Sequence, residues 1–272
     1  MKKISLRIND DILKEVDSYV DLLNIKNRSQ AIKYLLKQSL GTEKSAVILC
    51  KGLDNEYQNL KKNLLVAKNQ YNSLIKLKNN LVLIQNQVKQ LKKFGFGIIY
   101  IINIEQIIEE IKPILSKEKG VIFHFITIDN VCKTLDAIKL LNGKIANDFL
   151  VIFSDVYFDI NLNDLFNNHK KNDTIGTLTV MSSNKPNIKG CVEISGTIIK
   201  RFVEKPKKEK INFVFEPVFI LSSKIFEMKG QSLVYDLFPK LAKDEMLQGF
   251  LSSGHIIHLH KLQDKEKINE LL

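Results

Sequence analysis

The sequence has few cysteines and no long apolar run. Its three cysteines lie far apart in 272 residues, at Cys50, Cys132 and Cys191. This spacing lacks the paired pattern of a zinc site, and scattered free thiols are typical of a reducing compartment. No apolar run reaches the ~20 residues that span a bilayer, and the first residues lack the apolar core of a secretory signal. We therefore expect a globular, cytoplasmic protein without a membrane partner.

Acidic residues are also scarce relative to basic ones. The chain has 41 lysines and arginines against 30 aspartates and glutamates, which gives a formal net charge of +11. Such an excess favours a polyanionic partner, above all nucleic acid. A lysine-rich proteome would produce the same balance, so charge alone does not identify the partner. Apolar residues make up 44% of the chain, which is enough for a sizeable core.

Residues 2–40 contain one strand pattern followed by two helix patterns. Apolar and polar residues alternate over residues 3–8. A first helix is expected after Asn9 or Asp10, and a second helix is expected to be capped by Ser29. Because these short elements cannot bury their apolar surface alone, we expect two copies to pair their strands and interlock their helices.

This pattern resembles the ribbon-helix-helix family of DNA-binding proteins, to which Arc and MetJ belong. Members of that family dimerise and insert a two-stranded ribbon into the major groove. The resemblance implies that the polar strand face contacts base edges through Lys3, Ser5 and Arg7. It also implies that the start of the second helix holds a DNA phosphate near Asn27, Arg28 and Ser29. A dimerisation arm that never touches DNA is the alternative interpretation.

From residue 45 onward, strand and helix patterns alternate, which is the signature of a parallel sheet covered by helices. Strands are expected at 45–50, 98–102, 121–126 and 149–153, and helices at 81–94, 104–115 and 134–141. The last of these strands is continuously apolar and is followed by Ser154 and Asp155. An acid at the carboxyl end of such a strand either holds a metal or a sugar or merely caps the turn.

Residues 45–260 resemble the sugar-1-phosphate nucleotidyltransferases. The resemblance rests on the segment Phe149–Asp159, on Lys189-Gly-Cys-Val-Glu193, on the Glu204-Lys205-Pro206 ending of a strand, and on Asp236–Leu241. It implies a Rossmann-like, GT-A-like mixed sheet flanked by helices. Enzymes of this family join a nucleoside triphosphate to a sugar phosphate and release pyrophosphate, with positive charge, magnesium and alignment doing most of the work.

The resemblance also implies a binding site for a nucleotide or a nucleotide sugar. Its residues would be Asp155, Gly190, Glu193, Glu204 and Lys205. Asp155 takes the position of the family's first metal-binding acid. We expect Mg²⁺ only if nucleotidyl transfer survives, because one acid without its partner holds this ion poorly.

Several positions that serve the triphosphate in this family carry other residues. A glycine-rich loop with an arginine should follow the first strand, but residues 51–57 contain one glycine, and Glu56 stands where the arginine belongs. Asn72 replaces a phosphate-binding lysine, and Lys133 replaces the glycine that opens a Gly-Thr-x-Asp-Ala helix. These changes predict weaker binding of the nucleoside triphosphate.

The positions for the sugar and the second metal acid differ as well. Phe215-Glu-Pro217 replaces the Asn-Ala-Gly segment of the sugar pocket, and residues 256–260 replace the segment that supplies the second acid. His258 and His260 share a face of a predicted strand and are a candidate metal pair, although no third ligand is evident. Together these losses predict that nucleotidyl transfer is absent.

We therefore expect a non-enzymatic, DNA-binding transcriptional regulator with two domains. Residues 1–41 would form a β-α-α ribbon-helix-helix unit, and residues 45–272 an inactive nucleotidyltransferase-like domain that acts as a ligand sensor or scaffold. The expected assembly is a homodimer or a higher even oligomer on double-stranded DNA. Two alternatives stay open: an active sugar-1-phosphate nucleotidyltransferase with a dimerisation arm, and a partition or antitoxin-like DNA binder.

Overall fold

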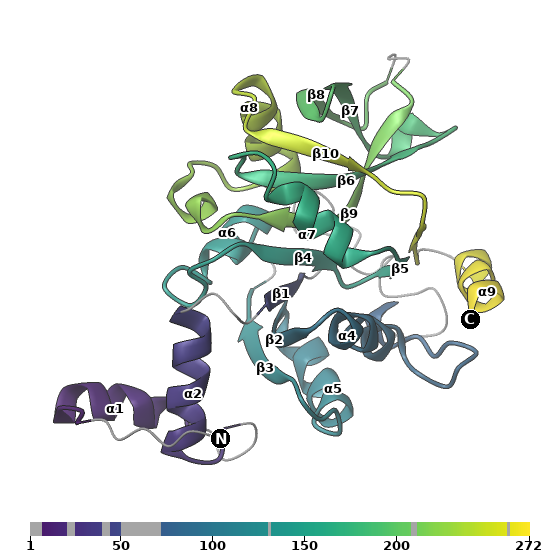
Figure 1. Ribbon diagram of the computed structural model, residues 1–272. Coiled ribbons are helices and arrows are strands. Elements are labelled where there is room, and N and C mark those ends of the chain that lie inside the picture. Colours follow the sequence, from purple (N-terminus) through teal and green to yellow (C-terminus); the bar gives the residue numbers. More distant parts are fainter. Residues whose placement is uncertain are drawn as a thin grey trace.

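Two N-terminal helices lie beside a larger α/β body in the computed structural model (Figure 1). The structure describes residues 7–20, 25–39, 44–49, 72–129, 132–207, 211–259 and 262–272. The predicted base-contacting residues Lys3 and Ser5 lie outside the described residues, and so does the segment 51–57. Among the described helices, none has the length and apolar character that crossing a membrane requires.

A nine-stranded mixed sheet forms the centre of the α/β body, in the order β3-β2-β1-β4-β9-β6-β10-β8-β7. Its strands are β1 Lys44–Leu49, β2 Phe96–Asn103, β3 Ile122–Thr127, β4 Phe149–Phe153, β6 Gly176–Ser182, β7 Gly190–Ser195, β8 Ile198–Glu204, β9 Phe213–Leu221 and β10 Leu247–Leu251. The first four strands of this order run parallel, and β9 is antiparallel to both β4 and β6. The expected mixed sheet flanked by helices is confirmed.

Helices cover both faces of this sheet, and the alternation of apolar residues along each strand explains why. In β1, Ala46 and Ile48 pack with helices α4, α5 and α7, whereas Val47 and Leu49 pack with α2, α6 and α8. The helices are α1 Asp10–Ser18, α2 Arg28–Ser39, α4 Leu83–Lys93, α5 Glu105–Leu115, α6 Thr134–Lys139, α7 Leu162–His169, α8 Phe238–Lys243 and α9 Leu262–Leu271. Short helical turns are η2 Asn72–Leu74, η3 Pro186–Ile188, η4 Ser223–Glu227 and η5 Leu233–Leu237.

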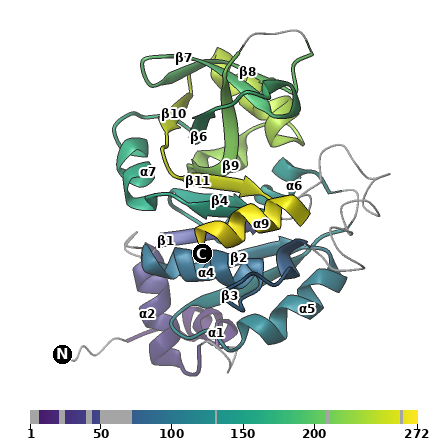
Figure 2. The ribbon, with the colours of Figure 1, turned by 90° about the vertical axis from the view of Figure 1, so that its right-hand side faces the viewer.

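A small second sheet pairs β5 (Val156–Asp159) antiparallel with β11 (His255–His258). The C-terminal helix α9 lies against β11 (Figure 2). Its Ile268 is fully buried, and its Asn269 side chain accepts a hydrogen bond from the backbone N–H of Lys78 at 2.7 Å. The last helix therefore holds β11 in place beside the main sheet.

Both N-terminal helices begin at an asparagine cap. The Asn9 side chain accepts a hydrogen bond from the Ile12 N–H at 3.0 Å, as predicted. The prediction of Ser29 as the second cap was wrong, since α2 starts at Arg28 and the Asn27 side chain accepts from the Gln30 N–H at 3.0 Å. Asn27 directly precedes the helix and so occupies the capping position, whereas Ser29 already lies inside the first turn.

The N-terminal helices pack on the outer edge of the sheet, at β3 (Figures 1 and 2). The Tyr34 hydroxyl on α2 makes a 2.9 Å hydrogen bond with Nε2 of His124 on β3, and the His124 ring stacks on Tyr100 at 4.8 Å between centroids. Val16 and Ala31 join the same apolar cluster as β2. In one chain these helices therefore share the core of the α/β body, and they cover the edge strand.

Candidate functional site

β4 ends in a tight turn that contains Asp155. Gln87 on α4 holds this turn, because its Nε2 donates to the carbonyls of Phe153 at 2.9 Å and Val156 at 2.7 Å. Gln87 and Asp155 are both buried. The sequence-predicted acid is therefore fixed at the carboxyl end of a central strand, the usual place for ligand sites in such sheets.

The strand β11 runs beside this turn. His258 pairs with Val156, and the Leu259 N–H donates to the Asp155 carbonyl at 2.8 Å. The segment that replaces the family's second metal acid thus lies next to Asp155, with His258 at its end. His260 lies outside the described residues, so the proposed histidine pair remains a prediction.

A buried carboxylate joins this region from β9. Glu216 is 2% exposed, and its Oε1 forms an ion pair with Nζ of Lys189. Its Oε2 lies 2.8 Å from Nε2 of His258. A carboxylate this deep needs such partners, because burying a charge without compensation is costly. In the sequence, Glu216 was noted only as part of the Phe215-Glu-Pro217 segment that replaces the family's Asn-Ala-Gly.

A bulge in β9 places Glu216 at this position. Leu178 on β6 pairs with Phe219, but the next residue, Thr179, pairs with Glu216, so the register shifts between them. Pro217 lies inside the shift, where its missing N–H does not interrupt the ladder. A bulge of this kind turns a side chain out of the regular alternation of the strand.

The ends of β7 and β8 meet beside Lys189. Gly190 pairs with Glu204, and the Lys205 N–H donates to the Lys189 carbonyl at 3.0 Å. Lys205 has φ of +48°, an uncommon conformation for a residue with a side chain. A Cβ on Gly190 would lie 2.6 Å from the Phe202 ring and 2.8 Å from the Glu204 carboxylate, so any larger residue would force these side chains to shift. The structure thus brings three predicted residues together.

Glu193 has a different environment from the other predicted ligand residues. It forms an ion pair at 3.0 Å with Arg201 of the neighbouring strand β8, and both side chains are about half exposed, at 49% and 47%. Exposed ion pairs of this kind contribute little to stability. The contact with Arg201 indicates that Glu193 takes part in the pairing of β7 with β8.

The predicted phosphate-contacting residues of the N-terminal region have partners within the chain. The Arg28 guanidinium donates to both carboxylate oxygens of Asp17, at 2.6 and 2.7 Å. This hydrogen-bonded pairing lowers the pKa of Asp17 and raises that of Arg28. Asn27 caps α2, and Ser29 and Arg7 are exposed. The charge of Arg28 is therefore balanced by Asp17.

The donor set next to Asp155 bears on the metal that the family resemblance implies. Among the described residues, no group of three His, Cys, Asp or Glu side chains is arranged to hold a metal ion. Glu216 contacts Lys189 and His258 with its two oxygens. The Asp155 carboxylate is a hard oxygen ligand, and Mg²⁺ commonly combines one or two carboxylates with phosphate oxygens and water. Asp155 therefore fits as one ligand of a Mg²⁺ ion completed by a bound phosphate.

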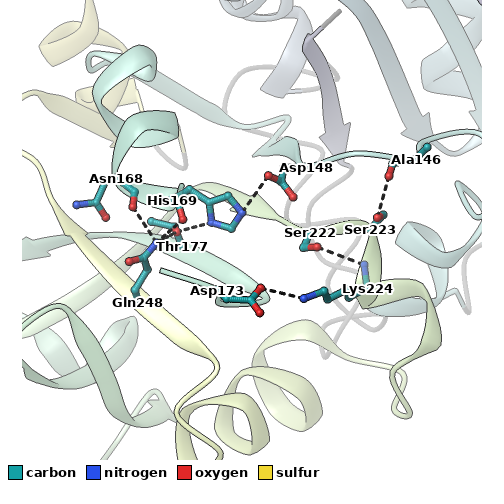
Figure 3. A network of polar contacts seen from close by, with 10 residues as sticks. All are labelled: Ala146, Asp148, Asn168, His169, Asp173, Thr177, Ser222, Ser223, Lys224 and Gln248. Atoms are coloured by element: carbon teal, nitrogen blue, oxygen red, sulfur yellow. Dashed lines mark hydrogen bonds and ion pairs between the residues drawn. The ribbon is translucent and has the colours of Figure 1, made fainter. Parts of the chain in front are cut away.

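A second polar network lies at the opposite end of β4 (Figure 3). Nδ1 of His169 lies 2.7 Å from Oγ1 of Thr177, and Nε2 of His169 lies 3.6 Å from a carboxylate oxygen of Asp148. Gln248 donates to the same Thr177 hydroxyl at 2.8 Å. An Asp-His-Thr sequence suggests a nucleophile, but the buried Thr177 hydroxyl is already bonded to both His169 and Gln248. This network is structural.

Three residues near Asp155 were missed by sequence reasoning: Gln87, Lys189 and Glu216. Gln87 gives no sequence signal, because any helical glutamine looks the same. Lys189 precedes the recognised Gly190, and Glu216 is a charged residue inside an otherwise apolar strand pattern, Phe213–Leu221. A charge at such a position is rarely buried without a partner, and that was the available signal.

Comparison with known proteins gives a consistent result. A family model described as nucleotidyl transferase matches residues 66–254. The chain is 26% identical over 174 residues to the bifunctional protein GlmU of Methanococcus aeolicus, covering 57% of this chain and 41% of that protein. It is 28% identical over 159 residues to mannose-1-phosphate guanyltransferase of Saccharomyces cerevisiae, covering 55% of this chain and 44% of that protein. The matched part spans less than half the length of these curated relatives.

Solved structures show the same fold. The inositol-1-phosphate CTP transferase of T. maritima superposes with a TM-score of 0.69 at 16% identity, covering 84% of this chain and 94% of that chain. At this identity the likeness shows the fold alone.

These findings correct the functional prediction. The matching family model is described as nucleotidyl transferase and the yeast relative is named as a guanyltransferase, so the prediction of a DNA-binding transcriptional regulator was wrong, and so was the prediction that the chain is not an enzyme. The family match also lends no support to a partition or antitoxin-like binder. The prediction took the absence of family motif residues as evidence that the activity was absent. The structure instead brings other polar side chains, those of Lys189, Glu216 and His258, together beside the segment that contains Asp155. The match over residues 66–254, more than half of the chain, shows that this protein belongs to the nucleotidyl transferase family.

Proposed function

We propose that this protein is a nucleotidyltransferase that joins a nucleoside triphosphate to a sugar 1-phosphate and releases pyrophosphate. One observation carries the proposal. Lys189, Glu216 and His258 come from three separate segments and contact one another, and the backbone of β11 that carries His258 pairs with the segment that follows Asp155. A fold without a function at this position has no need to bury a charged group there and then supply it with two partners.

The predicted site residues take specific roles in this proposal. Asp155 holds Mg²⁺, which neutralises phosphate charge when it is bound. Glu204 and Lys205, at the end of β8, face the sugar phosphate, and Gly190 leaves room for the Glu204 carboxylate. Two observations support these roles. A Cβ added to Gly190 would lie 2.8 Å from the Glu204 carboxylate, and the backbone of Lys205 is in the left-handed region.

A pyrophosphate-release assay tests the proposed reaction. The full chain is incubated with each nucleoside triphosphate, a panel of sugar 1-phosphates and Mg²⁺, and the sugar nucleotide is identified by mass spectrometry. We expect pyrophosphate release that needs both substrates and falls at least about 100-fold in Asp155→Asn, since metal and charge stabilisation supply most of the rate in such reactions. Asp159→Asn, on the neighbouring strand, is the control. Absence of turnover with every substrate pair would contradict the proposal.

We also propose that residues 1–41 form a ribbon-helix-helix unit that dimerises the enzyme, followed by the catalytic domain at 45–272. Two apolar side chains support the dimerisation, because Ile12 on α1 and Leu36 on α2 are each 51% exposed in a single chain. Light scattering of the full chain is expected to give a dimer. The double substitution Ile12→Lys and Leu36→Lys should give a folded monomer. A monomeric wild-type chain at every concentration would contradict this part.

A further inference from the structure

Lys189, Glu216 and His258, here called the Glu216 cluster, have an arrangement that the family resemblance does not explain. The carboxylate lies underneath, with 3% of its side chain exposed, and its two partners reach solvent, with 25% exposed for Lys189 and 21% for His258. The surface therefore presents the ammonium of Lys189 and the second ring nitrogen of His258, which is a donor when the ring is protonated, and the acceptor that orients both groups is buried below.

The burial of Glu216 restricts what this cluster can bind. Both carboxylate oxygens already accept from Lys189 and His258, so a cationic or amino group of a ligand cannot reach them. The partly exposed groups are an ammonium and an imidazole. An ammonium carries three N–H donors and no acceptor, so it selects oxygen acceptors, and charged oxygens most strongly.

The backbone around the cluster limits its freedom to move. The Lys189 carbonyl accepts from the N–H of Lys205, and His258 is paired in β11 against β5. Glu216 lies at the bulge beside Pro217. Donors fixed in this way lose little conformational freedom when a ligand arrives, which favours binding.

We propose that the Glu216 cluster is an oxyanion site in which Lys189 and His258 bind a phosphate group of a substrate, with Glu216 as the residue that positions them. The inference rests on the proposed function for the identity of the phosphate, which belongs either to the sugar 1-phosphate or to the triphosphate. It assigns Lys189 and His258 to ligand contact, a role that the family resemblance gives to neither residue. Glu216 acts only through them.

Equilibrium binding to the full chain tests this site. Titration calorimetry with glucose 1-phosphate, a nucleoside triphosphate and pyrophosphate is run on the wild type, Lys189→Ala, His258→Asn and Glu216→Gln. We expect each variant to raise the Kd of at least one of the three ligands by about tenfold or more, which is the usual effect of losing a hydrogen bond to a charged group. Loss confined to glucose 1-phosphate identifies the sugar phosphate, and loss confined to the other two identifies the triphosphate.

Controls separate a binding role from a structural one. Lys200→Ala removes a comparable surface lysine, which pairs with Glu245 at 2.7 Å, and should bind like the wild type. Lys189→Arg keeps the charge and should recover part of the affinity lost in Lys189→Ala. Circular dichroism and Tm confirm that each variant is folded. In the turnover assay the variants should raise KM for the identified substrate more than they lower kcat.

The outcomes distinguish this site from the proposed reaction. Binding by the wild type that the variants weaken, without turnover, would support the site and overturn the reaction. Turnover with unchanged KM and unchanged affinity in folded Lys189→Ala and Glu216→Gln would overturn the site and leave the reaction standing. Wild-type protein that binds none of the three ligands would also overturn the site.

Discussion

Gln87 shows how a single buried side chain controls the position of Asp155. Its amide nitrogen donates to the carbonyls on both sides of the turn, those of Phe153 and Val156. The bond to Val156 is buried and the bond to Phe153 is partly buried, so water replaces this donor poorly. The conformation of the β4–β5 turn therefore depends on a residue of α4.

Replacing Gln87 by leucine should destabilise the protein and impair the site. Both carbonyls would lose their partner, and leaving a buried acceptor unsatisfied costs about 1–3 kcal/mol of unfolding free energy. Urea unfolding measures this loss, and the pyrophosphate assay should show a lower kcat. Gln90→Leu, a partly exposed position on the same helix, is the matched control and should leave both values unchanged.

At the scale of elements, the polar network of Figure 3 joins α7, β6 and β10. Thr177 on β6 contacts His169 of α7 at 2.7 Å and Gln248 of β10 at 2.8 Å. Gln248 also donates to the carbonyls of Asn168 and His169, each at 3.1 Å. The end of α7 is thus held by β10, a strand that comes much later in the chain.

Thr177→Val should lower the unfolding free energy by about 1–3 kcal/mol, because the buried groups of His169 and Gln248 lose a partner. The same strand supplies a control of equal burial. Thr179 is fully buried as well, and its hydroxyl makes no hydrogen bond with any residue that the structure describes. Thr179→Val should therefore be neutral or slightly stabilising. Equal losses in the two variants, measured by urea unfolding, would contradict the structural role of the network.

A polar contact joins the N-terminal helices to the sheet. Tyr34→Phe keeps the ring packing and removes the 2.9 Å bond to His124, so the unfolding free energy should fall by about 0.5–1.5 kcal/mol. Limited proteolysis should also cut the N-terminal segment faster. Tyr19→Phe, at the more exposed neighbouring ring, is the control and should behave like the wild type.

At the scale of the whole molecule, three aspartates make stability depend on pH. The pKa of Asp148 is lowered by its contact with His169, and that of Asp236 by hydrogen bonds from the backbone N–H groups of Ser232 and Gln231. The pKa of Asp17 is lowered by Arg28. Each folded pKa lies below the unfolded one, so each contribution is complete above the unfolded pKa and is lost as pH falls through the folded pKa.

Asp148→Asn should therefore lower Tm by a few degrees at neutral pH and have little effect in strong acid. The difference from the wild type should begin to shrink near the unfolded pKa of about 3.9 and vanish below the folded value. Tm scans between neutral pH and about pH 2.5 measure this difference. Asp173→Asn, which loses only an exposed pair with Lys224, is the control. A constant difference at all pH values would contradict the assignment.

Local patterns predicted most of the described helices and strands up to β4. The expected strands at 45–50, 98–102 and 121–126 correspond to β1, β2 and β3, with bounds that differ by a few residues. The expected helices at 81–94 and 104–115 correspond to α4 and α5. These predictions succeeded because buried strands have continuous apolar runs and covering helices have apolar residues at helical spacing, and both signals are contained within each segment.

The sequence by itself therefore determined the order of strands and helices up to β4, the class of the sheet and the position of Asp155 at the end of its strand. Only the tertiary structure decided which charged residues meet there. Lys189, Glu216 and His258 are brought together by the pairing of β11 with β5 and by a bulge in β9. Long-range strand pairing and a local register shift leave no periodic signal in the sequence. Comparison of single motif positions therefore showed only that the family's residues were missing, whereas the fold brings Lys189, Glu216 and His258 together at this place.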